Sequence, residues 1–100
     1  MPLTIRLESE NGSIVGEVTD FVNTITRLSE SLGQGVLEIA HTIDPYGDTS
    51  MNALQIPLFL RDIERLRQVC AQEEHILQLV EDLARKSQSD HHVYLKFYGD

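Results

Sequence analysis

The side chains best suited to chemistry are histidines and aspartates in two separate stretches. His41, Asp44 and Asp48 lie in the central stretch 41–60, and His91 and His92 open a final stretch that alternates in polarity. Imidazole and carboxylate groups together bind transition metals. If segments 36–43 and 91–98 are neighbouring strands, His41 and His92 could meet. Adjacent strand residues point to opposite faces, so at most one of His91 and His92 joins such a site. The spacing matches no established metal motif, and histidines at strand ends are the simpler interpretation.

Other reactive groups favour structural roles. Cys70 is the single cysteine, which excludes an internal disulfide, and its position beside Leu66 and Val69 in a helical stripe is typical of a small core residue. The Gly33-Gln34-Gly35 turn lacks the third glycine and the following helix of a phosphate-binding loop. We therefore assign no catalytic residue, no cofactor and no metal ligand from the sequence.

An interaction surface is the other candidate site. In the final stretch, His92, Tyr94, Lys96 and Tyr98 share one side of a strand. Tyrosine-rich faces suit protein contacts. The polar side chains of the central loop could extend this surface. The full candidate set is His41, Asp44, Tyr46, Asp48, Asn52, His92, Tyr94, Lys96 and Tyr98. The alternatives are a solvated sheet face, or an edge strand that pairs with a second copy of the chain.

The elements that would position these groups begin with a hairpin. Residues 3–8 and 13–18 are predicted to be strands around Asn11-Gly12, which favours a type I′ turn, and Gly16 either weakens the pairing or marks a bulge. Thr19 or Asp20 caps a helix whose stripe starts at Phe21 and which ends at Gly33. Residues 36–43 are apolar enough for an interior strand.

The second half is predicted to be mainly helical. Residues 44–47 have turn chemistry, residues 48–52 form a polar loop, and Pro57 opens a helix that runs to about Cys70. Asp62 is expected on the polar side of this helix. After a break near residues 71–73, a second helix reaches about Lys86, and residues 91–98 form the last strand.

The sum is one domain over residues 1–100 of the α+β class. Its elements follow the order β-β-α-β-α-α-β, with a single antiparallel or mixed sheet and helices packed on one face.

The net charge of the chain limits the classes of molecule that it can bind. Sixteen acidic residues against 8 basic ones give a formal net charge of −8, which argues against nucleic acid and anionic membranes as ligands. It permits a basic protein partner. The N-terminus has no signal-peptide pattern and the longest apolar run is short, so we expect a cytoplasmic protein without a membrane anchor.

Two segments carry a resemblance. The stretch Asp-Pro-Tyr-Gly-Asp-Thr at 44–49, followed by Asn52 and Leu54-Gln55, and the ending Tyr-Leu-Lys-Phe-Tyr-Gly-Asp at 94–100, resemble a group of uncharacterised small acidic bacterial proteins. The resemblance implies a bacterial, cytosolic origin and transfers no functional residue.

Two functional hypotheses follow. The first is a small, soluble, non-enzymatic protein-binding or regulatory protein, with an immunity or antitoxin-like role suggested by analogy of size and charge, and with a homodimer as a further option. The second is a small metal-dependent or hydrolase-like enzyme that uses loop 41–52 and His92.

Overall fold

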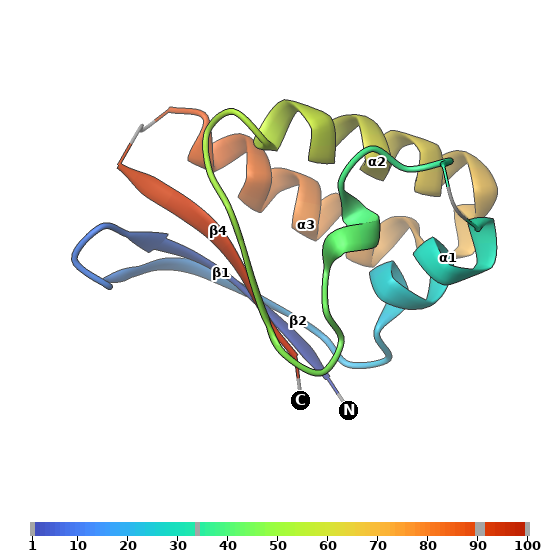
Figure 1. Ribbon diagram of the computed structural model, residues 1–100, viewed down its shortest axis with the longest axis horizontal. Coiled ribbons are helices and arrows are strands. Elements are labelled where there is room, and N and C mark those ends of the chain that lie inside the picture. The colour runs from blue at the N-terminus through green and yellow to red at the C-terminus, as the bar shows by residue number, and fades with distance from the viewer. Residues whose placement is uncertain (1, 34, 90–91, 100) are drawn as a thin grey trace.

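The computed structural model describes residues 2–33, 35–89 and 92–99. One antiparallel sheet has the strand order β2-β1-β4-β3, and three helices pack on one of its faces (Figure 1). The strands are β1 (Leu3–Ser9), β2 (Ile14–Asp20), β3 (Asp48–Met51) and β4 (Val93–Tyr98). The helices are α1 (Thr24–Leu32), α2 (Ile56–Val69) and α3 (Glu74–Ser87), with 3-10 turns η1 (Ala40–Thr42) and η2 (Ala71–Glu73). The predicted fold class and element order are confirmed.

Alternating polarity places the strands as expected. The apolar residues of β1 and β4 face the helices and are buried, and their polar neighbours face away. The β1–β2 turn is a hairpin, but of a different type from the one predicted. Gly12 has a φ of 86° and Asn11 does not have a positive φ, whereas a type I′ turn needs positive φ at both positions. The predicted bulge is present, since the register shifts as Leu7 pairs with Gly16 and Glu8 with Ile14.

The third strand is not where we predicted it. Strand β3 begins only at Asp48, so the prediction of a polar loop at residues 48–52 is also wrong. Segment 36–43 is irregular and contains η1. The reason is a buried carboxylate: Asp62 accepts hydrogen bonds from the backbone N–H groups of Glu38, Ile39 and Ala40, at 2.7, 2.8 and 2.7 Å. A strand would need these N–H groups for its ladder. The apolar residues of the segment still enter the core, from beside the sheet rather than within it.

The start of α1 also differs from the prediction. Phe21 is 75% exposed, because the chain first makes a turn in which Asn23 adopts a left-handed conformation with a φ of 52°. The helix begins at Thr24, and the Asp20 carboxylate accepts a hydrogen bond from the N–H of Ile25 at 3.1 Å. Gly33 follows the last turn with a φ of 80°, as expected of a helix-ending glycine.

The other two helices follow the prediction closely. Pro57 lies in the first turn of α2, and the extended backbone of Cys70, with φ −143° and ψ 91°, separates α2 from α3. Arg67 of α2 crosses to α3, where it donates to Glu74 at 2.6 Å and to Glu81 at 2.8 Å. This contact lowers the pKa of Glu81.

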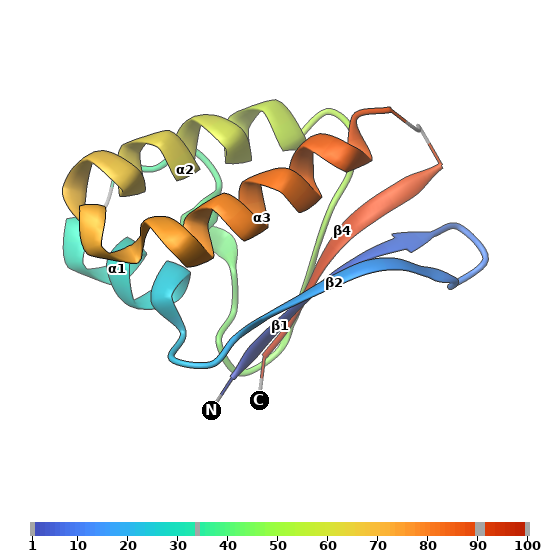
Figure 2. The same cartoon turned by 180° about the vertical axis from the view of Figure 1, so that it is seen from behind.

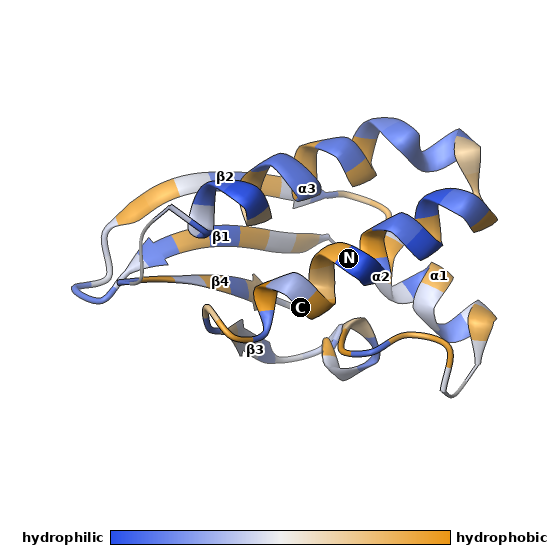
Figure 3. Cartoon of the chain, turned by 90° about the horizontal axis from the view of Figure 1, so that it is seen from above, coloured by the Kyte–Doolittle hydropathy of each residue, from blue (hydrophilic) through white to orange (hydrophobic). Residues whose placement is uncertain are grey.

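The core lies between the sheet and the helices. Hydrophobic and hydrophilic residues alternate along α2 and α3, so each helix has an apolar side (Figure 3). Phe59 of α2 meets Phe97 of β4 edge to face, with ring centroids 5.3 Å apart. Within the described residues, no helix is both long and apolar enough to cross a membrane.

Candidate functional site

One face of the sheet carries no helix, as the two opposite views show (Figures 1 and 2). We call it the open face and define it by side chains that alternate with the buried ones: Thr4, Arg6, Glu8, Glu17, Asp48, Ser50, Tyr94, Lys96 and Tyr98. Strand register arranges them in rows, because residues paired across strands project from the same side. Tyr98 lies between Thr4 and Asp48, and Lys96 lies between Arg6 and Ser50.

The centre of the open face is a network of side chains. The hydroxyl of Tyr98 donates to Glu8 Oε2 at 2.5 Å, and Lys96 Nζ lies 3.6 Å from Glu8 Oε1. Arg6 donates to Glu17 at 2.6 Å and places its guanidinium carbon 5.3 Å from the Tyr98 ring centroid. These neighbours leave only 9% of the Glu8 side chain exposed. The side chains at the centre of the open face therefore limit one another's conformational freedom.

Glu8 also changes the chemistry of Tyr98. The hydrogen bond to the Glu8 carboxylate, followed by burial and by the charge of Glu8, raises the pKa of Tyr98 from 10.0 to about 12. The phenol thus stays protonated, and remains a hydrogen-bond donor, at any ordinary pH.

Glu8→Gln is expected to lower the pKa of Tyr98 towards 10.0, because it weakens the hydrogen bond that raises this pKa most and removes the negative charge that favours the neutral phenol. The absorbance of phenolate in a pH titration measures this change in pKa. The variant Tyr98→Phe shows which ionisation step, the one at the highest pH, belongs to Tyr98. Glu10→Gln, which neutralises a carboxylate in the turn of the same β1–β2 hairpin, is the matched control and should leave that step in place. The pKa of Tyr98 is higher in the folded protein than in the unfolded chain. The hydrogen bond between Tyr98 and Glu8 therefore stabilises the fold fully below about pH 10, and this stabilisation is lost as the pH rises through about 12. A wild-type titration without a late step that Tyr98→Phe removes would contradict this assignment.

The loop before β3 is fixed to the end of β4. Asp44 Oδ1 accepts the N–H of Tyr46 at 2.8 Å, and the Asp44 N–H donates to Thr49 Oγ1 at 3.1 Å. Gly99 N donates to Gly47 O at 2.7 Å. The polar residues of this loop therefore mainly hold its own backbone. Tyr46 is the exception, with 81% of its surface exposed.

Asn52 has a structural partner as well. Its Oδ1 accepts the N–H groups of Leu54 and Gln55, at 3.0 and 3.2 Å, while Gln55 Oε1 accepts the N–H of Asn52 at 2.9 Å. This reciprocal pair precedes α2 in the manner of a capping box. The Asn52 side chain therefore stabilises the start of α2 and does not belong to the open face.

The predicted set is thus brought together in part. Tyr94, Lys96, Tyr98 and Asp48 share the open face. Asp44 and Tyr46 lie in the turn next to the end of β4.

The two histidines of the metal hypothesis are not brought together. His41 lies on η1, which contacts α1, whereas His92 lies just before β4, with its Nδ1 3.1 Å from Glu10 Oε1. Segment 36–43 is not a strand next to β4, which removes the condition on which their meeting depended. Among the described residues, no group of three or more histidine, cysteine, aspartate or glutamate side chains is placed to hold a metal ion. His91 lies outside the described residues.

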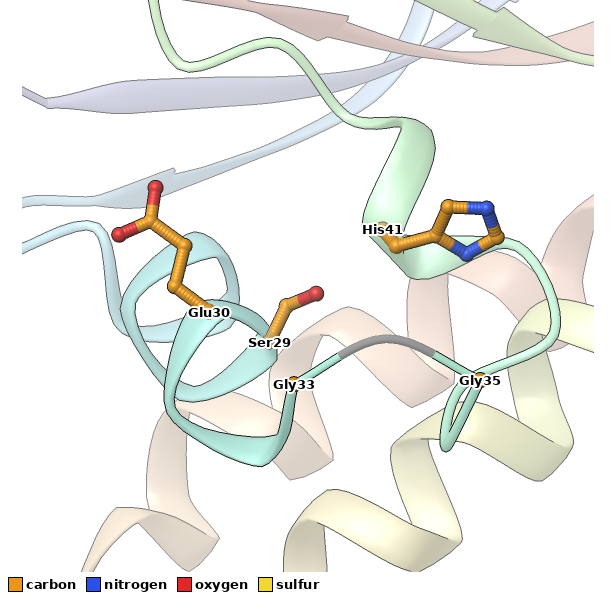
Figure 4. A pocket seen from close by; sticks show the side chains of 5 residues that line it. All are labelled: Ser29, Glu30, Gly33, Gly35 and His41. Carbon is orange, nitrogen blue, oxygen red and sulfur yellow. The ribbon is translucent and has the colours of Figure 1, made fainter.

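His41 instead borders a cavity of about 430 Å³. Ser29 and Glu30 of α1 lie on the opposite wall, and Gly33 and Gly35 lie along its edge. Figure 4 shows Glu30 pointing away from His41, and the imidazole ring pointing away from Ser29. The three side chains do not converge on a common point, so they do not form a nucleophile with its base.

Sequence reasoning missed two important carboxylates. Asp62 is fully buried rather than on the polar side of α2, although its spacing from Phe59 and Leu66 places it on the apolar stripe, and this was the available signal. Glu8 faces away from the helices, as the alternation of β1 predicts, but its partners were not predictable. Only the pairing of β1 with β4, which brings Tyr98 and Lys96 near it, reveals its role.

Comparison of the chain with models of protein families, with curated proteins and with solved structures finds no match in any of the three. Inference about function therefore rests on the geometry of the chain itself.

Proposed function

We propose that this is a cytoplasmic, non-enzymatic protein that recognises a protein partner through the open face. The observation that supports this most is the network of Arg6, Glu8, Lys96 and Tyr98 on a sheet face without a helix. Tyrosine and arginine are enriched among the residues that dominate binding energy. Side chains already held by one another lose less freedom on binding, which favours affinity.

Charge supports a basic partner. The open face itself mixes both signs, with Arg6 and Lys96 beside Glu8, Glu17 and Asp48. The chain as a whole carries a net charge of −8, which attracts a basic protein from a distance and raises the association rate. An immunity or antitoxin-like role fits this combination by analogy.

The test compares three immobilised forms of the protein as baits for cell extract. A double substitution, Tyr94→Ala with Tyr98→Ala, removes both aromatic side chains of the open face. Leu54→Ala is the matched control, since Leu54 is 85% exposed and precedes α2. We expect a protein retained by wild type and by the control but lost with the double substitution. For the purified pair, affinity should fall at least about tenfold.

Circular dichroism of the double substitution checks that the fold is intact. If wild type and the folded double substitution retain the same proteins, the open face is not the binding surface. Sedimentation at several concentrations shows whether the partner is a second copy. We considered residues 91–98 as an edge strand that could pair with a second copy, and this is wrong, because β4 lies between β1 and β3. A homodimer by strand pairing would therefore use an edge strand such as β2, where Ile14 is 54% and Val15 43% exposed.

A further inference from the structure

The outer edge of the sheet at β2 is open to a further strand. β2 lies at one end of the strand order and has seven residues, whereas β3, at the other end, has four. Figure 2 shows β2 in the foreground, with α3 above it. An edge strand presents unpaired backbone N–H and C=O groups, which proteins commonly protect with lysine or proline. β2 contains neither residue, and its register with β1 is regular from Gly16 to Asp20.

Exposed apolar side chains gather along this edge. Among the described residues, eight large hydrophobic side chains are exposed, and five of them belong to β2, to the two residues after it, or to α3. These five are Ile14, Val15, Phe21, Val22 and Leu79. Such a concentration of apolar side chains on one part of a surface is typical of a binding site.

A groove of about 370 Å³ lies at the C-terminal end of β2. Its apolar walls are Phe21 and Val22, which follow the strand, and Ile76 and Leu79 of α3. Next to it on β2, Val18 is only partly buried against the core. A strand added beside β2 would point every second side chain towards the helices. Apolar side chains at those positions would cover Val18 and enter the groove.

The charged groups of the groove already have structural roles. Asp20 is 1% exposed and accepts the N–H of Ile25, and Glu73 is paired with Arg27 at 3.4 Å. Recognition inside the groove is therefore apolar. Outside it, Glu17 lies on the open-face side of β2, and its side chain is 42% exposed although its Oε2 accepts from Arg6.

Charge distinguishes a second copy of the chain from a different partner. If β2 paired along its full length with its own copy in the antiparallel sense, the middle residue Glu17 would lie opposite itself. Like charges directly opposite one another destabilise a sheet. Two chains that each carry a net charge of −8 also repel one another. A partner strand with basic residues near Glu17 avoids both effects.

We propose that β2 binds an extended segment of a protein partner as a fifth strand of the sheet. Apolar and basic residues alternate along this segment. The apolar side chains lie on the helix side, against Ile76 and Leu79, and the basic ones lie on the open-face side, near Glu17. Backbone hydrogen bonds along the edge supply affinity, and the groove selects the apolar side chains. The site is distinct from the interaction proposed for Tyr94 and Tyr98 of β4, and either proposal can fail alone.

The experiment titrates the isotope-labelled full chain with the peptide Lys-Ile-Lys-Val-Lys-Ile-Lys and follows backbone amide signals by NMR. We expect the amide signals of residues 14–22 to shift, and hydrogen exchange of the outward-pointing amides of β2 to slow.

Two control peptides test the mode of binding. One carries N-methyl groups on two adjacent central residues, whose N–H groups point to opposite edges, so it cannot pair regularly along either edge. The other has glutamate in place of lysine. Each should bind at least about tenfold more weakly than the parent peptide.

Three variants of the chain locate the site. Leu79→Ser, at an exposed position, removes an apolar wall and should weaken the parent peptide. Glu17→Gln should narrow the difference between the lysine and glutamate peptides. Leu54→Ser is the matched control, since Leu54 is 85% exposed and precedes α2, and it should bind like wild type. The double substitution of Tyr94 and Tyr98 should also bind like wild type, which separates this proposal from the preceding one.

Three results would overturn the proposal. The first is that the shifted amides lie away from β2, or that none shift at any soluble concentration of peptide. The second is that the N-methylated peptide binds as tightly as its parent, because binding would then not use backbone pairing. The third is a dimer of the chain alone, seen by sedimentation, in which the amides of β2 are protected, because a second copy would then occupy the edge.

Discussion

Asp62→Ala is expected to lower the free energy of unfolding by about 3–5 kcal/mol, because it removes one charged acceptor from three backbone N–H groups. Two of those groups belong to Ile39 and Ala40, which are buried, so losing the carboxylate leaves buried donors unsatisfied. The loss should appear as local disorder of segment 36–43 as well as reduced global stability. Urea denaturation measures the global change, and hydrogen exchange of the Ile39 and Ala40 amides measures the local one.

Asp82→Ala is the matched control, since Asp82 lies exposed on α3 and accepts only a side-chain hydrogen bond from Gln78. Its effect should stay within about 0.5 kcal/mol. Asp62→Asn should not restore stability, because an amide offers one acceptor oxygen and turns its own N–H₂ towards the backbone donors. Wild-type exchange rates at Ile39 and Ala40 in Asp62→Ala would show that the carboxylate does not hold this segment.

Phe97→Ala is expected to cost about 3–5 kcal/mol, because Phe97 is fully buried on a central strand and its removal leaves a cavity against Phe59. Thermal or urea unfolding measures the loss. Phe97→Leu fills part of the space and should cost clearly less.

Tyr94→Ala provides the comparison on the same strand. Tyr94 faces the open side, so this substitution should cost about 1 kcal/mol or less. Equal losses from Phe97→Ala and Tyr94→Ala would mean that the apolar side of β4 does not face the core.

The fold class was predictable because two periodicities dominate the sequence. Strict alternation marked β1 and β4, and a stripe at helical spacing marked α2 and α3. The third strand was misplaced because segment 36–43 is apolar enough for a strand while its N–H groups bind Asp62, a contact that no local pattern contains. The start of α1 was misplaced for a related reason, since the left-handed turn at Asn23 gives no clear local signal.

The residues of the candidate site were likewise predictable only in part. Tyr94, Lys96 and Tyr98 were predictable as a group because they lie on one strand. The contributions of Arg6 and Glu8 depend on which strand is adjacent to β4, and this is a property of the sheet order rather than of any segment.

The pairing of β1 with β4 has a consequence for biosynthesis. The sheet can close only after residues 93–98 have left the ribosome, because β4 lies between β1 and β3. Until then the hairpin of β1 and β2 lacks its neighbour, and β3 has no strand to join. Closing so long a loop is slow. During synthesis, the edge of β1 that later pairs with β4 is therefore unpaired until the last residues of β4 emerge.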